Sequence, residues 1–385
     1  MNYFLNILGK SLANKKFLLL LFLLLVSVFS AFSEGSEEAG KFYLDPRLVP
    51  WGIDTDFCFR FGPGLYEGVD TILRFTVGSA INWNGYYRDE NDIYTDSRDF
   101  DYMYTRLNAN WGLGLEQGLL WNDETNKNLL SLFLRYKGMR VWNFDMFDMN
   151  SILFDSIRSD KDGVLSNTFI VSLIFDNTFF HQETGLKQGF YTEFSIEKGP
   201  KWFFNDTIGI ADFTKVFMGV KYFHPVHETK DKEKTIIKAI YFADSAGVDY
   251  SFGDNIPLPA RQTFGVHRPE DGCGGKVRGF ETRRFDSEVK VINNFDIRFI
   301  MPKVKTKSGT KVFRPGFLTF FDACYFAKLE GYKDTGEGVL MSAGFSIFSE
   351  FLFMGNCVLT VGFPIIGERI DKNPTTISVD YGLRF

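Results

Sequence analysis

The stretch GCGGKVRGF, residues 272–280, places a single arginine among glycines, and glycine-rich loops can cradle phosphates. A Walker loop, however, needs GxxxxGK followed by Ser or Thr. Here Val277 follows Lys276, and Glu270 stands where the first glycine belongs. The dinucleotide pattern GxGxxG also fails, because Val277 occupies the place of its third glycine. What remains is Arg278, a planar cation whose forked donors suit carboxylates better than a lysine could.

The other candidate sites carry less chemistry. His224 and His227 lie in HPVH without an evident third ligand, and we expect a turn that leads into the charged stretch ETKDKEK. The acidic and aromatic stretch 85–104 is expected to be a surface loop with strand ends. No Ser–His–Asp ordering stands out among four histidines, so we expect no enzyme, no metal site and no cofactor. A net charge of −5 gives no sign of a nucleic-acid partner.

The elements that must position Arg278 are predicted to be strands. Short alternating runs rich in aromatic and β-branched residues recur along the chain, and no helical period is sustained. In KVFMGVKYF, residues 215–223, one face carries large apolar side chains and the other carries Phe217, Gly219 and Lys221. The members of the large apolar face are Val216, Met218, Val220 and Tyr222. The chain is therefore predicted to be all-β.

The first 33 residues are predicted to be a signal peptide. Lys15 and Lys16 precede an uncharged apolar run over 17–32, and small residues lie before the expected cleavage after Ser33. A retained membrane anchor is the alternative, but it needs about 20 apolar residues. No later segment is long and apolar enough for a membrane helix, so we expect an exported chain.

Three features favour a transmembrane antiparallel β-barrel over a soluble sandwich. The chain is expected to be exported, many strands are about ten residues long, and small or polar residues alternate with large apolar ones. The 352 residues after the signal peptide suggest about 16 strands, at roughly 22 residues for each strand and its connection. We expect a short periplasmic segment over 34–52 and the barrel over 53–385, with an inserted loop around 253–285. The first strand is expected at 57–66.

The chain ends in TISVDYGLRF, where alternate residues share one apolar face. This ending resembles the C-terminal signal strand of bacterial outer-membrane barrels, which the assembly machinery reads. Tyr381, Leu383 and Phe385 are the residues that carry the resemblance. They imply an outer-membrane location in a Gram-negative type of envelope, with membrane lipid around the barrel.

Val277, Arg278, Gly279 and Phe280 resemble the VRGF motif of the BamA/TamA superfamily of outer-membrane barrels. Residues 253–265, 294–302 and 317–326 are similar to family segments around this motif, and five strands are expected to follow it. In that family the motif lies on a loop that enters the barrel from outside, and its arginine meets acids on the inner wall.

The resemblance implies that Asp322 is the first partner of Arg278 and that Asp296 is the second. An unpaired charge inside a barrel would be very costly, so a carboxylate partner is also expected on physical grounds. Gly274, Gly275 and Gly279 are expected to let the loop bend and approach the wall closely.

Relatives that assemble proteins carry periplasmic POTRA modules, for which the stretch before the first expected strand is too short. We therefore expect a barrel-only member that assists insertion or translocation of proteins or lipids. Its partners would be nascent outer-membrane or secreted proteins, and the assembly machinery during its own insertion. A weak seam between the Gly62–Pro63–Gly64 region and the last strand, which contains Gly382, is a further hypothesis. A porin-like pore, a surface-antigen barrel and an exported soluble β protein remain alternatives.

The four cysteines form no CxxC pair, and their pairing cannot be read from the sequence. They are Cys58, Cys273, Cys324 and Cys357. We expect them to be unpaired small hydrophobic residues, although a disulfide is possible in an exported protein.

Overall fold

The computed structural model describes twelve stretches of the chain, and the predicted signal peptide lies outside them. The described residues are 42–49, 52–61, 68–87, 103–145, 151–181, 186–230, 236–280, 287–305, 311–329, 338–351, 355–367 and 376–381. None of the described helices is long and apolar enough to cross a membrane.

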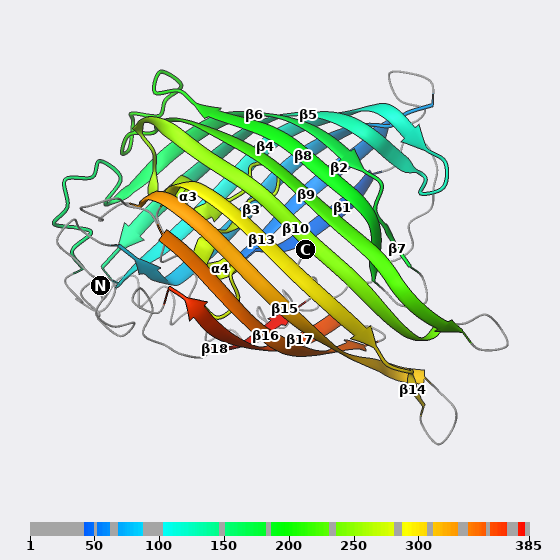
Figure 1. The fold of residues 1–385 in the computed structure, drawn as a ribbon. Coiled ribbons are helices and arrows are strands. Elements are labelled where there is room, and N and C mark those ends of the chain that lie inside the picture. The colour runs from blue at the N-terminus through cyan, green and yellow to red at the C-terminus, as the bar shows by residue number, and fades with distance from the viewer. Residues whose placement is uncertain are drawn as a thin grey trace, which may run out of the picture.

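The wall of the molecule is one antiparallel sheet that rolls into a barrel (Figure 1). Fourteen strands form a meander in which each strand pairs with the next wall strand along the chain. They are β1 (Phe42–Val49), β2 (Gly52–Phe61), β3 (Thr71–Tyr86), β4 (Met103–Asn122), β5 (Lys127–Phe144), β6 (Gly163–Asp176), β8 (Lys187–Gly199), β9 (Asp212–Lys230), β10 (Ile236–Asn255), β13 (Ser287–Ile300), β15 (Lys311–Leu329), β16 (Gly338–Phe351), β17 (Gly355–Ile366) and β18 (Thr376–Tyr381). Two short strands, β7 (Phe179–Phe180) and β14 (Val304–Lys305), pair with β8 and β15. Among the described residues the wall therefore has fourteen strands, against the predicted number of about 16, and the two-residue β7 and β14 are too short to cross a membrane.

The two faces of the wall differ as the alternation predicts. On β9, the outward Met218 is 63% exposed, whereas Lys215 on the inner face is 1% exposed. On β6, Phe169, Val171 and Leu173 are exposed on the outside, and the serines and threonine between and beside them are buried inside. Because successive side chains of a strand point to opposite faces, this composition gives an apolar exterior and a polar interior.

Two local predictions are wrong. The sheet begins before residue 53, because β1 occupies part of the expected periplasmic segment and pairs with β2 over its whole length. Of the expected first strand at 57–66, residues 57–61 are the later part of β2, and residues 62–66 lie outside the described residues. HPVH is not a turn, because β9 continues through it to Lys230, with a register irregularity where Pro225 cannot donate to the ladder.

The segment between β10 and β13 leaves the wall and lies inside the barrel (Figure 1). It contains α3 (Leu258–Gln262), β11 (Thr263–Phe264), β12 (Glu270–Asp271) and α4 (Cys273–Lys276), and we call residues 256–280 the inserted segment. Its start agrees with the expected loop, and residues 281–286 lie outside the described part. Five wall strands follow it, namely β13, β15, β16, β17 and β18, as the resemblance implied.

The meander has β1 at one end and β18 at the other, and within the described residues neither pairs with the other. Tyr381 is the last residue of β18 and lies in register with Cys357 on β17. Residues 62–64, on which the seam hypothesis depends, lie outside the described residues, as do Gly382, Leu383 and Phe385. The seam and the terminal signal therefore stay predictions.

Candidate functional site at the inserted segment

Arg278 is buried against the inner wall, where Asp322 of β15 accepts three hydrogen bonds from it. The guanidinium donates from Nε to Asp322 Oδ2 at 2.8 Å and from Nη2 to Asp322 Oδ1 at 2.7 Å. The backbone N–H of Arg278 also donates to Asp322 Oδ2, at 2.9 Å. This forked contact is the geometry that only arginine among the cations can make. The structure thus brings together the arginine and the acid that the sequence put first.

Asp296 of β13 is the second acid at the site. Arg278 Nη2 donates to its Oδ1 at 2.6 Å, and Arg298 donates to its Oδ2 from Nε at 3.1 Å and from Nη2 at 2.9 Å. Two arginines and two aspartates therefore form one buried network whose formal charges cancel. Arg298 was not singled out in the sequence, although it stands two residues beyond Asp296 and so on the same strand face.

The network makes the cation on Arg278 more stable than in water. Burial alone would lower the pKa of Arg278, but the hydrogen bonds and charges of Asp322 and Asp296 outweigh burial and raise it. The guanidinium carbon also lies 3.8 Å from the ring centroid of Phe320, which adds a cation–π contact. The charge on Arg278 is therefore a permanent part of the site.

The other motif residues seat the inserted segment on the wall. Val277 and Phe280 are buried in an apolar cluster with Ile292 of β13 and Leu340 of β16. Gly279 has a φ of 108°, which side-chain-bearing residues rarely adopt. We expected the loop backbone to approach the barrel wall closely at these glycines, and it does so at Gly279.

The partner of that close approach is Gly362 on β17, which the sequence analysis missed. A Cβ on Gly362 would lie 2.7 Å from both the backbone N and the Cα of Gly279. Backbone atoms cannot move aside as the end of a flexible side chain can, so the segment docks only where the strand has no side chain. A glycine inside a strand is the one sequence signal for such a contact.

Replacing Gly362 by valine is expected to displace residues 278–280 from β17 while β17 itself remains a good strand, because valine favours strands. We expect faster proteolysis of the inserted segment in the folded barrel, measured by mass spectrometry of the fragments. Gly118→Val is the comparison, at a glycine of β4 whose Cβ would meet the side chain of Asn128 on β5, outside the apolar cluster that holds the inserted segment. Equal protection of the segment in the wild type and in Gly362→Val would contradict the docking role.

The predicted glycines of α4 lie where the segment turns. Gly274 is buried within α4, and a Cβ on Gly275 would lie 2.4 Å from Cβ of Asp271. Asn294 of β13 donates from Nδ2 to the carbonyl of Lys276 at 2.7 Å, which fixes the end of α4 to the wall. Gly275 is thus required for the tight path into the motif.

The expectation that all four cysteines are unpaired is wrong. Cys273 of α4 and Cys324 of β15 form a disulfide, with their Cα atoms 6.0 Å apart, whereas Cys58 and Cys357 take part in no disulfide within the described part of the chain. The bridge joins the inserted segment to the same strand that carries Asp322. A covalent bond and a buried ion pair therefore hold the segment at neighbouring points.

The rest of the inserted segment reaches the opposite side of the wall. Arg106 of β4 donates to Gln262 at 2.7 Å, and the ring of His267 lies 4.3 Å from that of Phe133 on β5. Lys215 of β9 donates to the carbonyl of Thr263 at 3.0 Å. These contacts run from β4 to β17, so the segment crosses the interior of the barrel.

A second buried charge cluster fixes the middle of the segment. Asp249 of β10 lies 3.0 Å from Lys215 Nζ and 3.6 Å from Lys290 Nζ, and it accepts from the N–H of Gly265 at 2.8 Å. This cluster could not be predicted from sequence patterns, because its three charged members lie on three different strands.

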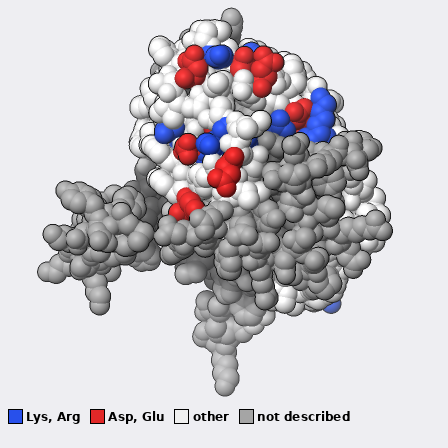
Figure 2. All heavy atoms as spheres, turned by 90° about the vertical axis from the view of Figure 1, so that its left-hand side faces the viewer, with Lys and Arg blue, Asp and Glu red and all other residues white. Residues whose placement is uncertain are grey.

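The end of the barrel on the left of Figure 1 is seen face-on in Figure 2. Basic and acidic side chains are interspersed over the coloured part of this face, without a large area of one sign. Within the described residues, no group of three or more potential ligands could hold a metal ion.

No protein-family model and no curated protein matches the chain. Among solved structures, the chain is similar to BamA from Haemophilus ducreyi lacking POTRA domains 1-3, with a TM-score of 0.46 and 14% sequence identity. The match covers 86% of this chain and 62% of that chain, so this chain spans less than two thirds of the length of that structure.

Proposed function

We propose that the chain is an outer-membrane barrel that assists the insertion or translocation of proteins or lipids at that membrane. The observation that carries the proposal is the buried contact of Arg278 with Asp322 and Asp296. The VRGF resemblance named these residues, and it is a resemblance to barrels of the assembly and translocation family. The apolar exterior of the wall supports a membrane location, because lipid would cover it.

The inserted segment limits how such a barrel could work. Its contacts run across the interior from β4 to β17, which does not favour a cargo path through the lumen. The edges of the meander at β1 and β18 supply an alternative, since an exposed edge strand is a template with which another strand can pair. We propose that cargo strands meet the barrel at these edges.

Depletion of the chain is expected to lower the abundance of other outer-membrane barrels together, if the barrel works in their assembly. The measurement is quantitative proteomics of isolated outer membranes before and after depletion. Inner-membrane helical proteins serve as the control set, and their abundance should hold steady. If the other barrels also hold steady, general assembly is excluded and a dedicated cargo or a different role must replace it.

A crosslink between the sheet ends tests the edge hypothesis directly. One cysteine placed in β1 and one in β18 would be joined in a background in which Cys58 and Cys357 are replaced by serine. Loss of function on crosslinking, with recovery on reduction under conditions that leave the barrel folded, supports the edges as the working site. Full function in the crosslinked state contradicts it.

A pore is the second candidate, because the interior wall is polar. Arg74, Thr76 and Glu116 are inward residues that a water-filled channel would tolerate. Under this alternative, Arg278→Ala should raise the single-channel conductance in planar bilayers as the inserted segment loosens. An unchanged, near-zero conductance in that variant counts against a pore.

A further inference from the structure

A rigid turn over residues 200–211 joins β8 to β9 and is hydrogen-bonded along the edge of β6, beyond the residues of β6 that pair with β8. Asn205 is its centre and has no exposed surface. Its Nδ2 donates to the carbonyls of Asn167 and Pro200 at 2.9 and 3.0 Å, and its Oδ1 accepts from the N–H of Asn167 at 2.6 Å. The N–H of Leu165 donates to the carbonyl of Ile208 at 2.8 Å, so the turn is bound to β6 at both of its sides.

This rigid turn presents aromatic side chains outward. Trp202 is 77% exposed and Phe204 is 67% exposed. Phe204 also has a φ of 58°, a left-handed conformation that is an outlier for a bulky residue. Such strain persists only where the surroundings enforce it, and here the bonds of Asn205 do so. The strained backbone lowers the stability of the fold, yet it keeps the rings of Trp202 and Phe204 exposed and away from the core.

Phe203 lies between Trp202 and Phe204 in the chain and packs onto the outer wall. Together with three aromatic residues of the wall it forms what we call the aromatic platform, which consists of Trp111, Tyr136, Phe169 and Phe203. The ring centroid of Phe203 lies 4.8 Å from that of Phe169 and 5.8 Å from that of Tyr136. Trp202 continues the platform, with its ring 5.6 Å from that of Phe203.

The polar atoms of Trp111 and Tyr136 form hydrogen bonds within the protein. Trp111 Nε1 donates to Tyr136 Oη at 3.2 Å, and Tyr136 Oη donates to Asn167 Oδ1 at 2.7 Å. In water, these polar groups could form hydrogen bonds with solvent. In lipid they could not, and each polar group without a hydrogen bond would destabilise the structure by several kcal/mol. The internal hydrogen bonds therefore match an apolar surrounding.

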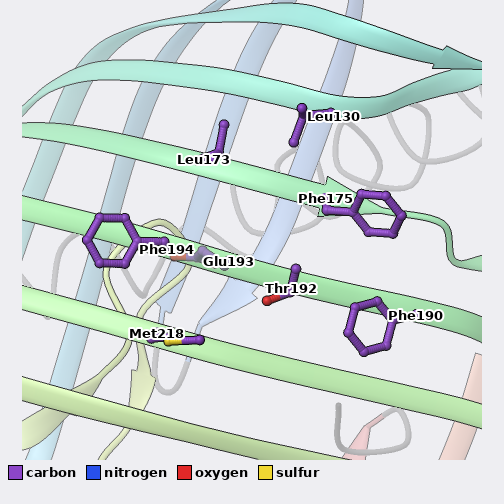
Figure 3. A pocket seen from close by; sticks show the side chains of 8 residues that line it. All are labelled: Leu130, Leu173, Phe175, Phe190, Thr192, Glu193, Phe194 and Met218. Carbon is purple, nitrogen blue, oxygen red and sulfur yellow. The ribbon is translucent and has the colours of Figure 1, made fainter.

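An apolar groove lies on the same wall as the platform (Figure 3). Its volume is about 470 Å³. It is lined by Leu130, Leu173, Phe175, Phe190, Thr192, Glu193, Phe194 and Met218. Phe169 of the platform is the register partner of Lys198, and Leu173 of the groove is the register partner of Phe194. These two rungs are four residues apart, or about 13 Å along the strands. Because strands of a membrane barrel tilt by about 35–45°, this corresponds to about 10 Å along the membrane normal, within the roughly 15 Å of hydrocarbon in one leaflet.

We propose that the platform and the groove together bind one membrane lipid, with its acyl chain in the groove and its polar end beside Trp202. This inference rests on the proposed membrane location and adds a ligand site on the outer wall. Tryptophan suits the boundary, because its ring is apolar and its N–H needs a polar partner. Lys198 is already paired with Asp212 at 3.6 Å, and exposed Lys201 and Asp206 offset each other. The acyl chain, rather than the charge of the headgroup, therefore selects the ligand.

The first test measures where Trp202 lies. The full chain is refolded into vesicles of phosphatidylcholine, with and without bromine on the acyl chains, and the emission of Trp202 is taken as the difference between the wild type and Trp202→Phe. We expect bromine near the headgroup end of the acyl chain to quench this emission more strongly than bromine near the methyl end, and aqueous iodide to quench it less than it quenches free tryptophan. Quenching by iodide together with insensitivity to brominated lipid would overturn the proposal.

The second test measures the groove. Leu173→Phe adds a ring to the groove wall, and Leu359→Phe makes the same change on the outer face of β17, which contributes no residue to the groove. Native mass spectrometry in detergent should detect one retained phosphatidylcholine on the wild type and on Leu359→Phe, and its loss in Leu173→Phe. Equal retention by all three proteins would contradict the groove as the site.

Flotation of the vesicles separates the two levels of inference. A chain that does not float with the vesicles contradicts both the membrane location and the lipid site. A chain that floats, but whose Trp202 is quenched by iodide alone, contradicts only the lipid site.

Discussion

Arg278→Ala is expected to lower the free energy of unfolding of the barrel by about 3–5 kcal/mol, because it leaves buried carboxylates without their cation. Asp322 would lose two of its three hydrogen bonds from Arg278 and keep the one from the backbone N–H. Asp296 would keep Arg298. The measurement is urea unfolding of the folded barrel in lipid vesicles, followed by the mobility difference between folded and unfolded forms on a gel.

Three comparison variants identify the cause of this loss. Lys230→Ala removes a surface partner of Glu228 at 3.3 Å and should change stability by less than about 1 kcal/mol. Arg278→Lys keeps the charge but not the fork, so its loss should lie between those of alanine and wild type. Arg278→Met combined with Asp322→Leu removes both charges and should recover much of the alanine loss. If Arg278→Ala alone were as stable as wild type, the network would not hold the inserted segment.

Replacing Cys273 and Cys324 together by alanine is expected to lower the stability of the oxidised barrel by about 4 kcal/mol. The loop-closure relation gives this figure for a sequence separation of 51 residues, because the bridge restricts the unfolded chain. The same urea experiment, performed with and without a reductant, measures it. Reduced wild type and the double variant should unfold at nearly the same urea concentration.

Cys357→Ala provides the matched control, since Cys357 is free and exposed. It should leave unfolding unchanged with and without reductant. A reductant effect that persists in the variant lacking Cys273 and Cys324 would show that another pairing is responsible. Because Cys324 and Asp322 lie two residues apart on β15, the losses from removing both connections are not expected to add.

The contact of Arg278 with Asp322 and Asp296 could be predicted because two independent arguments both pointed to acidic partners for this arginine. A buried guanidinium needs carboxylates, and the similarity of the flanking segments to a known family indicated which ones. Gly362 could not be predicted, since nothing local separates it from the chain's other glycines. HPVH was misinterpreted because Pro225 suggested a turn, whereas cross-strand pairing with β10 carries β9 past it through an irregularity.

The sequence by itself determined the all-β class, the two unlike faces of the wall and the need of Arg278 for acidic partners. These properties follow from an alternation with a period of two residues and from the chemistry of single side chains, both of which are local. Only the tertiary structure decided the disulfide between Cys273 and Cys324, the seat of Gly279 on Gly362 and the pairing of Asp249 with lysines from other strands. Each of these contacts depends on strand register and on the path of the inserted segment, which bring together residues 34 to 83 positions apart. No short-range pattern encodes such distances.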